Sequence, residues 1–326
     1  MARAPRVRGA LCFSTGDGRR LLSHMPPIPP PRSEGYTEST DVGLYWCAYG
    51  DGSGERLLLL HGGPGAHHDY LLPQMLRLAN APSGKQRDLL FYDQRGGGRS
   101  RSDDREKEGY VGWQTHVADL AHVVAELGAA PLTLVGYSWG GLLALLYARE
   151  AAAGRVADAP SRLILIDPAP VTRHFRDQFE REFARRQAGP EVQALREQLA
   201  TSGLRERDID AYRHRSFELS VAGYFADPRA AVNLTPFRVT GRVQQAVWES
   251  LGDYDLLSDR DFERIMIPML IVHGKQDPIP VASSEACASA LHASLVVIDQ
   301  CGHVPYVEQP NALFAAIEDF LAQNRL

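Results

Sequence analysis

The chain has 326 residues, of which 44% are hydrophobic and 23% are charged, and its formal net charge is -5 with acidic and basic residues interspersed. This composition allows a large buried core and predicts one α/β domain, or one domain that carries an insertion. Because no basic patch stands out, nucleic acid and anionic membranes are excluded as partners.

The cysteines and the N-terminus indicate where the protein works. Four cysteines lie far apart without the spacing of a metal site, at Cys12, Cys47, Cys287 and Cys301. We therefore expect free thiols in a reducing compartment. The basic N-terminus lacks the apolar core of a signal peptide, and no apolar run has the length of a membrane span. The sequence predicts a cytoplasmic protein without metal or other cofactor, and it leaves the oligomeric state open.

The first part of the chain is predicted to form a tail and then a strand pair. Residues 1–34 are assigned to the tail because the proline run at 26–31 favours an extended polyproline conformation. The strand pair is predicted at 44–49 and 57–60, with a glycine-rich turn between them. The second strand leads into His-Gly-Gly-Pro-Gly at 61–65, whose glycines end the sheet and let the backbone approach a ligand closely.

The chemically most informative motif is Gly-x-Ser-x-Gly at 136–140, which follows the apolar run 132–135 and leads into a helix-forming stretch. A serine on a tight strand-to-helix turn needs small neighbours, which Gly136 and Gly140 provide. Such a turn lifts the Ser138 hydroxyl clear of the sheet, in the position of a nucleophile. The alternative is a glycine-rich turn whose serine caps the helix, and the motif alone does not decide between them.

Two backbone amides are expected to stabilise negative charge beside this serine, those of Gly63 and Trp139. Another glycine-rich turn follows the apolar run 89–92. There Asp93 and Arg95 are predicted to hydrogen-bond neighbouring loops and hold the oxyanion segment in place, without touching substrate.

Strands and helices alternate along the rest of the core. An amphipathic helix is predicted at 113–127, strands at 162–166, 269–272 and 295–298, and a closing helix at 311–324. This alternation predicts a mostly parallel central sheet with helices on both faces. In such sheets, ligands bind at the carboxyl ends of the strands.

A helical cap is predicted at 171–251, where no buried-strand pattern appears. The core domain would then comprise 35–170 and 252–326. Three aromatic residues recur every four positions at the start of the cap, and we expect them to form helix-packing core rather than a ligand site. They are Phe175, Phe179 and Phe183.

Three complementary side chains follow predicted strands, in the order serine, aspartate, histidine. Ser138, Asp277 and His303 match the order of the α/β-hydrolase arrangement. An imidazole can accept the serine proton near neutral pH, and a carboxylate on its other nitrogen fixes its tautomer and orientation. Asp167 and Asp299 also follow strands and compete for the role of the acid, with Asp167 the second choice.

Structural roles are the alternative for two members of this set. Asp277 precedes Pro278, a placement that turns favour, and His303 stands in a loop. The remaining histidines near strand ends are expected to be loop residues, namely His61, His67, His68 and His273.

Taken in order, the motifs at 61–65, 93–100 and 136–141 resemble those of the proline iminopeptidase (prolyl aminopeptidase) branch of the α/β-hydrolase superfamily. The similarity covers about 35–321, and Ser138, Asp277 and His303 match the catalytic triad position by position. The resemblance implies the α/β-hydrolase fold with a helical cap. It also implies a serine hydrolase that forms an acyl-enzyme and releases N-terminal residues from small peptides.

One position departs from the pattern of that branch. Its members hold the proline amine with glutamates, some in the cap and one commonly just after the triad aspartate, where this chain has Pro278. Glu218 or Glu249 could act from the cap, although solvated helix glutamates are the alternative. The same triad would also suit an esterase, a lactonase or a non-peptide amidase. A binding protein that uses the capped pocket is a third possibility, but its usual sign, a lost triad residue, is missing.

Overall fold

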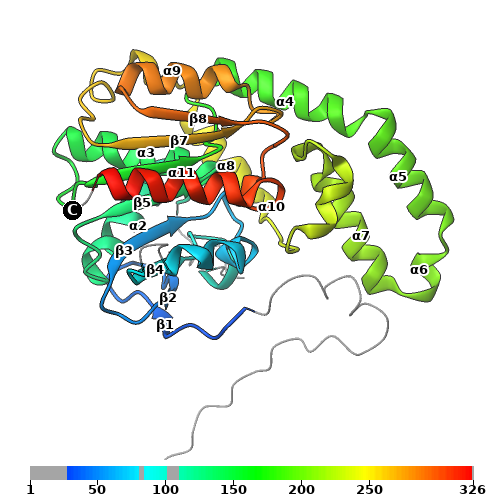
Figure 1. The fold of residues 1–326 in the computed structure, drawn as a ribbon, viewed down its shortest axis with the longest axis horizontal. Coiled ribbons are helices and arrows are strands. Elements are labelled where there is room, and N and C mark those ends of the chain that lie inside the picture. Colours follow the sequence, from blue (N-terminus) through cyan, green and yellow to red (C-terminus); the bar gives the residue numbers. More distant parts are fainter. Residues whose placement is uncertain (1–27, 81–83, 101–109, 325–326) are drawn as a thin grey trace, which may run out of the picture.

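The computed structural model describes residues 28–80, 84–100 and 110–324. Its centre is an eight-stranded sheet in the order β1-β2-β4-β3-β5-β6-β7-β8 (Figure 1). The strands are β1 (Ser33–Tyr36), β2 (Tyr45–Tyr49), β3 (Glu55–Leu60), β4 (Arg87–Tyr92), β5 (Thr133–Tyr137), β6 (Arg162–Ile166), β7 (Met269–Gly274) and β8 (Ser294–Ile298). β2 runs antiparallel to both of its neighbours, and the other pairs are parallel, which confirms the mostly parallel sheet.

Both faces of the sheet are covered, and β3 shows how. Leu58 and Leu60 pack in a core with residues of α2 (Trp113–Glu126), α3 (Trp139–Ala152) and α9 (Val281–Leu291). Leu57 and Leu59 point to the opposite face. There they pack in a second core with residues of the 3₁₀ helices η1 (His68–Leu71) and η2 (Gln74–Ala79) and of α11 (Pro310–Gln323). Burial on both faces explains the unbroken leucine run of this strand.

The predicted pairing of the first two strands is wrong. β4 lies between β2 and β3, pairing antiparallel with β2 and parallel with β3. β3 is apolar on both faces and therefore takes an interior position between parallel neighbours. β1 was not predicted either, and it begins at Ser33, within the range assigned to the tail. Its sequence has no apolar run, because it is an edge strand held by backbone pairing with β2 rather than by burial.

A helical insertion lies between β6 and β7 and extends beyond the sheet (Figure 1). Its elements are α4 (Arg173–Gln187), α5 (Pro190–Thr201), α6 (Leu204–Arg207), α7 (Ile209–Val221), η4 (Ala222–Tyr224), η5 (Pro228–Asn233) and α8 (Gly241–Leu251). Thr172 begins α4 as an N-cap, accepting a hydrogen bond from the Phe175 amide at 3.2 Å. The remaining short elements are η3 (Gly98–Ser100), η6 (Leu256–Ser258) and α10 (Pro305–Glu308).

Two predictions made from composition can be compared with the described residues. Cys47, Cys287 and Cys301 are buried free thiols, whereas Cys12 lies outside the described ranges. In the part of the chain that the structure describes, no helix is both long enough and apolar enough to cross a bilayer.

Candidate active site

Ser138 stands on the sharp turn between β5 and α3, with φ 54° and ψ -120°. The turn depends on its two glycines, because neighbouring backbone approaches them closely. A Cβ on Gly136 would lie 2.4 Å from the Gly140 carbonyl oxygen, and one on Gly140 would lie 2.1 Å from that of Leu60. The Ser138 side chain makes no hydrogen bond that caps α3. The hydroxyl instead faces a cavity, so the helix-capping alternative does not hold.

Ser138, His303 and Asp277 form one hydrogen-bonded chain. His303 Nε2 lies 2.9 Å from Ser138 Oγ, and His303 Nδ1 lies 2.7 Å from Asp277 Oδ2. The other Asp277 oxygen accepts a hydrogen bond from the Ile279 amide at 2.7 Å. Asp277 follows β7 and His303 follows β8, so the carboxyl ends of the strands bring them to Ser138. The structure thus unites the three predicted residues, while their catalytic roles stay a prediction.

Burial dominates the electrostatics of this chain. It raises the pKa of Asp277 above its usual range, although the neighbouring Asp167 side chain and the Ile279 amide act in the opposite direction. It lowers the pKa of His303 to about 4. The imidazole is therefore neutral near pH 7 and free to accept a proton from Ser138.

The two predicted oxyanion donors both border the cavity. Gly63 and Trp139 line it together with Ser138. Trp139 is the first residue of α3, where amides have no acceptor within the helix. The neighbouring Gly62 amide is occupied, since it donates to Tyr70 Oη at 2.6 Å. The position of Gly63 and Trp139 suits stabilisation of an oxyanion, which also stays a prediction.

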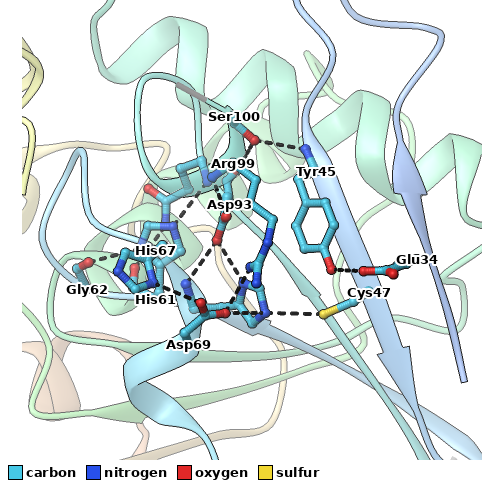
Figure 2. Close-up of polar contacts among 12 residues, drawn as sticks. Glu34, Tyr45, Cys47, His61, Gly62, His67, Asp69, Asp93, Arg99 and Ser100 are labelled. Atoms are coloured by element: carbon cyan, nitrogen blue, oxygen red, sulfur yellow. Dashed lines mark hydrogen bonds and ion pairs between the residues drawn. The ribbon is translucent and has the colours of Figure 1, made fainter. Parts of the chain in front are cut away.

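Asp93 holds the segment after β3, as expected (Figure 2). Its Oδ1 accepts hydrogen bonds from the His68 amide at 3.0 Å and from His68 Nδ1 at 2.7 Å. Its Oδ2 accepts one from the Arg99 amide at 2.8 Å. Although burial acts in the opposite direction, this pairing raises the pKa of His68 to about 10 and lowers that of Asp93 below its usual range. Arg95 pairs with Asp119 on α2 at 2.8 Å and with Asp41, in the loop between β1 and β2, at 3.2 Å.

Gln94, which the sequence analysis passed over, joins the two halves of the site. Its Nε2 donates to the His61 carbonyl at 2.8 Å, and its Oε1 accepts from Trp139 Nε1 at 2.7 Å. The side chain is fully buried. It therefore connects the loop that carries Gly63 to the first residue of α3. Its place between Asp93 and Arg95 in the motif at 93–100 was the available signal.

The expectation for the histidines needs two corrections, of which the first is that His68 begins the 3₁₀ helix η1 and does not lie in a loop. His273 is the fifth residue of β7 rather than a loop residue, and it is fully buried. Its Nδ1 lies 2.8 Å from Ser284 Oγ and its Nε2 lies 3.0 Å from the Ile279 carbonyl oxygen. These partners satisfy a polar ring that interrupts the apolar pattern, which is why the strand was predicted to end at residue 272, two residues early.

A cavity of about 700 Å³ lies over Ser138, between the sheet and the helical insertion. Much of its wall is aromatic, with contributions from Phe179, Phe217, Tyr224, Phe237 and Trp248. Charged residues also border it, namely Arg173, Arg176, Glu180 and Glu249. Three of these charges are paired, because Arg176 contacts Glu180 at 2.8 Å and stacks on the Trp248 ring, and Arg173 contacts Asp177 at 2.7 Å.

Of the two glutamates that were predicted to bind substrate, the structure places only one at the cavity. Glu249 lines the cavity, where its Oε1 accepts a hydrogen bond from Gln245 at 2.7 Å. Glu218 is not among the lining residues. It is buried, and its carboxylate pairs with His214 at 3.1 Å and with Arg215. Glu180 borders the cavity instead, and an exposed helix glutamate gives no sequence signal of that position.

The expectation for the phenylalanine stripe is wrong at Phe179. No residue of α4 is buried, and Phe179 lines the cavity. Phe183 packs on the ring of Tyr224, with centroids 4.4 Å apart, and Tyr224 stacks on His303 at 5.0 Å. Only Phe175 packs against the main core. A four-residue repeat shows which residues share a helix face, but not whether that face meets protein or a cavity.

Comparison with known proteins identifies the family. The model of the alpha/beta hydrolase family matches residues 57–317. The proline iminopeptidase of Saccharolobus solfataricus is 25% identical over 318 residues, covering 89% of this chain and 92% of that protein. The enzyme of the same name from Lactobacillus delbrueckii subsp. lactis is 44% identical over 91 residues, but this match spans only 30% of its length.

Solved structures show the same fold. The proline iminopeptidase of Mycobacterium smegmatis matches with a TM-score of 0.62 and 19% identity, covering 90% of this chain and 98% of that one. A proline iminopeptidase-related protein from Thermus thermophilus matches with a TM-score of 0.63 and 21% identity, covering 89% and 97%. The family match across most of the sequence, together with the strand order and the cap, establishes that the chain belongs to the α/β-hydrolase family and is related to the proline iminopeptidases.

Proposed function

We propose that the protein is a serine hydrolase that works through an acyl-enzyme. Ser138 attacks the substrate carbonyl, and His303 takes the serine proton and passes it to the leaving group. Asp277 holds the imidazole in the required tautomer. Water, activated by His303, then releases the acyl group. The observation that carries this proposal is the unbroken chain of hydrogen bonds, 2.9 Å and 2.7 Å long, beneath the cavity.

The tetrahedral intermediate needs donors for its oxyanion. The amides of Gly63 and Trp139 supply them, because both residues border the cavity beside Ser138. Gln94 supports this pair, since it bonds to the His61 carbonyl and to the Trp139 ring. The donors are thereby set before substrate arrives, which is the condition for strong electrostatic stabilisation.

For the substrate, we propose a small peptide from which an N-terminal residue, proline above all, is released. The relatives named proline iminopeptidase motivate this choice. Glu249 supports it, because its hydrogen-bonding partner Gln245 is neutral and leaves the carboxylate charge available for a substrate ammonium group. Glu180 already pairs with Arg176 and is less suited to that task.

A second candidate is hydrolysis of an ester, a lactone or a non-peptide amide by the same triad. Two observations favour it. Pro278, which is buried, offers no carboxylate at the position after Asp277. The cavity of about 700 Å³ has a largely aromatic wall that would accept an acyl group bulkier than proline.

Initial rates on proline p-nitroanilide and p-nitrophenyl acetate separate these candidates. Turnover of the proline amide at about 1 per second or faster, lost in Ser138→Ala, is expected of the aminopeptidase. Glu249→Gln should then raise KM for the amide and leave the ester rate unchanged. Ester turnover without proline release would reject the peptidase in favour of the second candidate.

Labelling with a fluorophosphonate probe tests the triad without assuming a substrate. The wild type should be labelled and Ser138→Ala should not. A wild-type protein that resists the probe and turns over neither substrate would reject the serine-hydrolase proposal and favour a binding function for the cavity.

A further inference from the structure

A second carboxyl group lies beside the triad, on Asp167 after β6. Asp167 is fully buried and has φ 41°, a conformation that few side chains tolerate. Its Oδ1 accepts a hydrogen bond from the Gly274 amide at 2.7 Å. Its Oδ2 is buried and has no donor among the described residues. The group near it is the carboxyl of Asp277: one oxygen of each carboxyl and one ring nitrogen of His303 all lie within 4.8 Å of one another.

Two carboxylates in such contact cannot both be ionised in a dry interior. Their mutual repulsion and the cost of burial are relieved when the pair holds one proton. This proton supplies the missing hydrogen bond of Asp167 Oδ2. The pair is thus a carboxylic acid bonded to a carboxylate.

The surrounding donors decide which residue keeps the proton. Asp277 receives hydrogen bonds from the Ile279 amide at 2.7 Å and from His303 Nδ1 at 2.7 Å. Asp167 receives one from the Gly274 amide. Because donors stabilise the charged form, the negative charge settles on Asp277 and the proton on Asp167.

We propose that Asp167 is a positioning residue, whose protonated carboxyl donates a hydrogen bond to Asp277 and keeps that carboxylate ionised and aimed at His303. The proposal rests on the proposed function, since it assigns Asp167 a role through the triad. It leaves Asp277 as the acid that contacts His303. It also gives a role to the aspartate that follows β6, the strand next to β7, whose end carries the predicted acid Asp277.

Other groups around the pair do not supply this proton. The titratable or charged residues that act on Asp167, Asp277 or His303 are Tyr137, Arg186, Tyr224, His273, Cys301, Tyr306 and Glu308. Burial raises the pKa of the tyrosines and of the Cys301 thiol, so they stay neutral, and it lowers the pKa of His273 to about 4. Glu308 adds negative charge, and its carboxylate is occupied by the amides of Ala226 and Gly302 at 2.8 Å each. Arg186 acts only through its charge.

Two substitutions distinguish a donor from a mere space filler. Asp167→Asn keeps an acceptor for Gly274 and an N–H donor for Asp277, and asparagine tolerates positive φ. Asp167→Gly removes the carboxyl group, while glycine adopts φ 41° without strain. Asp167→Ser, whose shorter side chain does not reach Asp277, is a second deletion in case the glycine variant fails to fold.

The measurement is the rate of Ser138 labelling by a fluorophosphonate as a function of pH, with thermal unfolding as the control for folding. Asp167→Asn should label within about twofold of the wild type and keep its acidic limb. The deletion variants should label about tenfold more slowly at pH 7, because a hydrogen bond to a charged group is lost. Their acidic limb should move up by about one pH unit, because Asp277 loses a donor and its pKa rises.

Two results would overturn the proposal. Deletion variants with wild-type rates and an unshifted acidic limb would show that the hydrogen bond is not used. A rate for Asp167→Asn as low as that of Asp277→Asn would show that Asp167 acts as an ionised acid instead. Absence of labelling in the wild type is a separate result, which would remove the proposed function and this proposal with it.

Discussion

The helices of the sheet domain and those of the cap differ sharply in burial. In α3, which carries Ser138 at its start, ten of 14 residues are buried, whereas none of the 15 residues of α4 is buried. The hydrogen-bonded chain from Ser138 to Asp277 therefore stands on tightly packed elements. The cavity above it is shaped by helices with few buried contacts, which are the kind of elements that open locally at low cost in free energy. Chemistry and substrate fit are thus supported by parts of the molecule with different stability.

The two parts meet at several places, for example where the Thr240 amide donates to the Gly65 carbonyl at 2.9 Å, and one of these places lies directly beside the triad. The His303 amide donates to the Tyr224 carbonyl at 2.7 Å, and the Tyr224 ring stacks on the imidazole. Glu308 accepts hydrogen bonds from Ala226 in the cap and Gly302 in the core.

The largest effect is expected in the core turn. Gly140→Ala places a Cβ 2.1 Å from the Leu60 carbonyl oxygen, so the strand and helix must separate. Urea denaturation should show a loss of about 3 kcal/mol or more in unfolding free energy. The control is Gly241→Ala at the start of α8, where a Cβ meets nothing within 4 Å and stability should stay within about 0.5 kcal/mol. Equal losses of unfolding free energy in the two variants would contradict the proposed difference in packing between the core turn and the cap.

The pair formed by His68 and Asp93 should make the core sensitive to alkali. The pKa of His68 is raised in the folded protein, from 6.5 to about 10. Its contribution is therefore fully present below pH 6.5 and is lost as the pH rises through 10. Between pH 7 and pH 10 the unfolding free energy of the wild type should fall by about 3 kcal/mol more than that of His68→Gln. Parallel curves for the two proteins would show that the pair carries no such linkage.

At the junction, Tyr224 should affect rate more than stability. Tyr224→Ala removes the ring stacked on His303 and should lower kcat by about fivefold, because the imidazole loses a packing partner worth about 1 kcal/mol. Tyr224→Phe retains the ring and serves as the matched control, with kcat near that of the wild type. If the phenylalanine variant loses as much as the alanine variant, the hydroxyl and not the stacking matters.

The smallest effect is expected within the cap. Phe179 lines the cavity on a helix without buried residues, so Phe179→Ala should leave the unfolding free energy within about 0.5 kcal/mol. KM for an aromatic ester should rise about threefold with kcat unchanged, since contact area is lost equally in the ground and transition states. Phe175→Ala, which removes a ring packed against the main core, should instead destabilise the protein. A fall in kcat for Phe179→Ala would place that ring in contact with the reacting groups.

The candidate site could be predicted from the sequence because the carboxyl ends of parallel strands lie along the same edge of the sheet. Ser138, Asp277 and His303 each follow an apolar run, and the sheet brings such positions together whatever lies between them in sequence. The pairing of β2 was missed because an apolar strand flanked by glycines looks the same beside either neighbour.

The cap residues were beyond reach for another reason. Glu218 and Glu180 are both helix glutamates, yet one is buried in ion pairs and the other borders the cavity. That difference depends on the angle at which each helix lies over the sheet, which periodicity does not encode. Gln94 was overlooked because its neighbours Asp93 and Arg95 are charged and a neutral amide gives a weaker signal in the sequence. Its side chain nevertheless links the His61 carbonyl to the Trp139 ring.

The bond between the His303 amide and the Tyr224 carbonyl bears on how such a protein can diversify. It joins main chain to main chain, so any residue except proline at position 303 could donate it and any residue at position 224 could accept it. Sequence drift in the cap therefore leaves the bond untouched. A change in loop length that moves the backbone at residues 224–226 would instead break this bond and free the backbone of His303. New substrate ranges should accordingly arise through side-chain substitutions and outward extensions of the cap, while the backbone bond between residues 303 and 224 is kept.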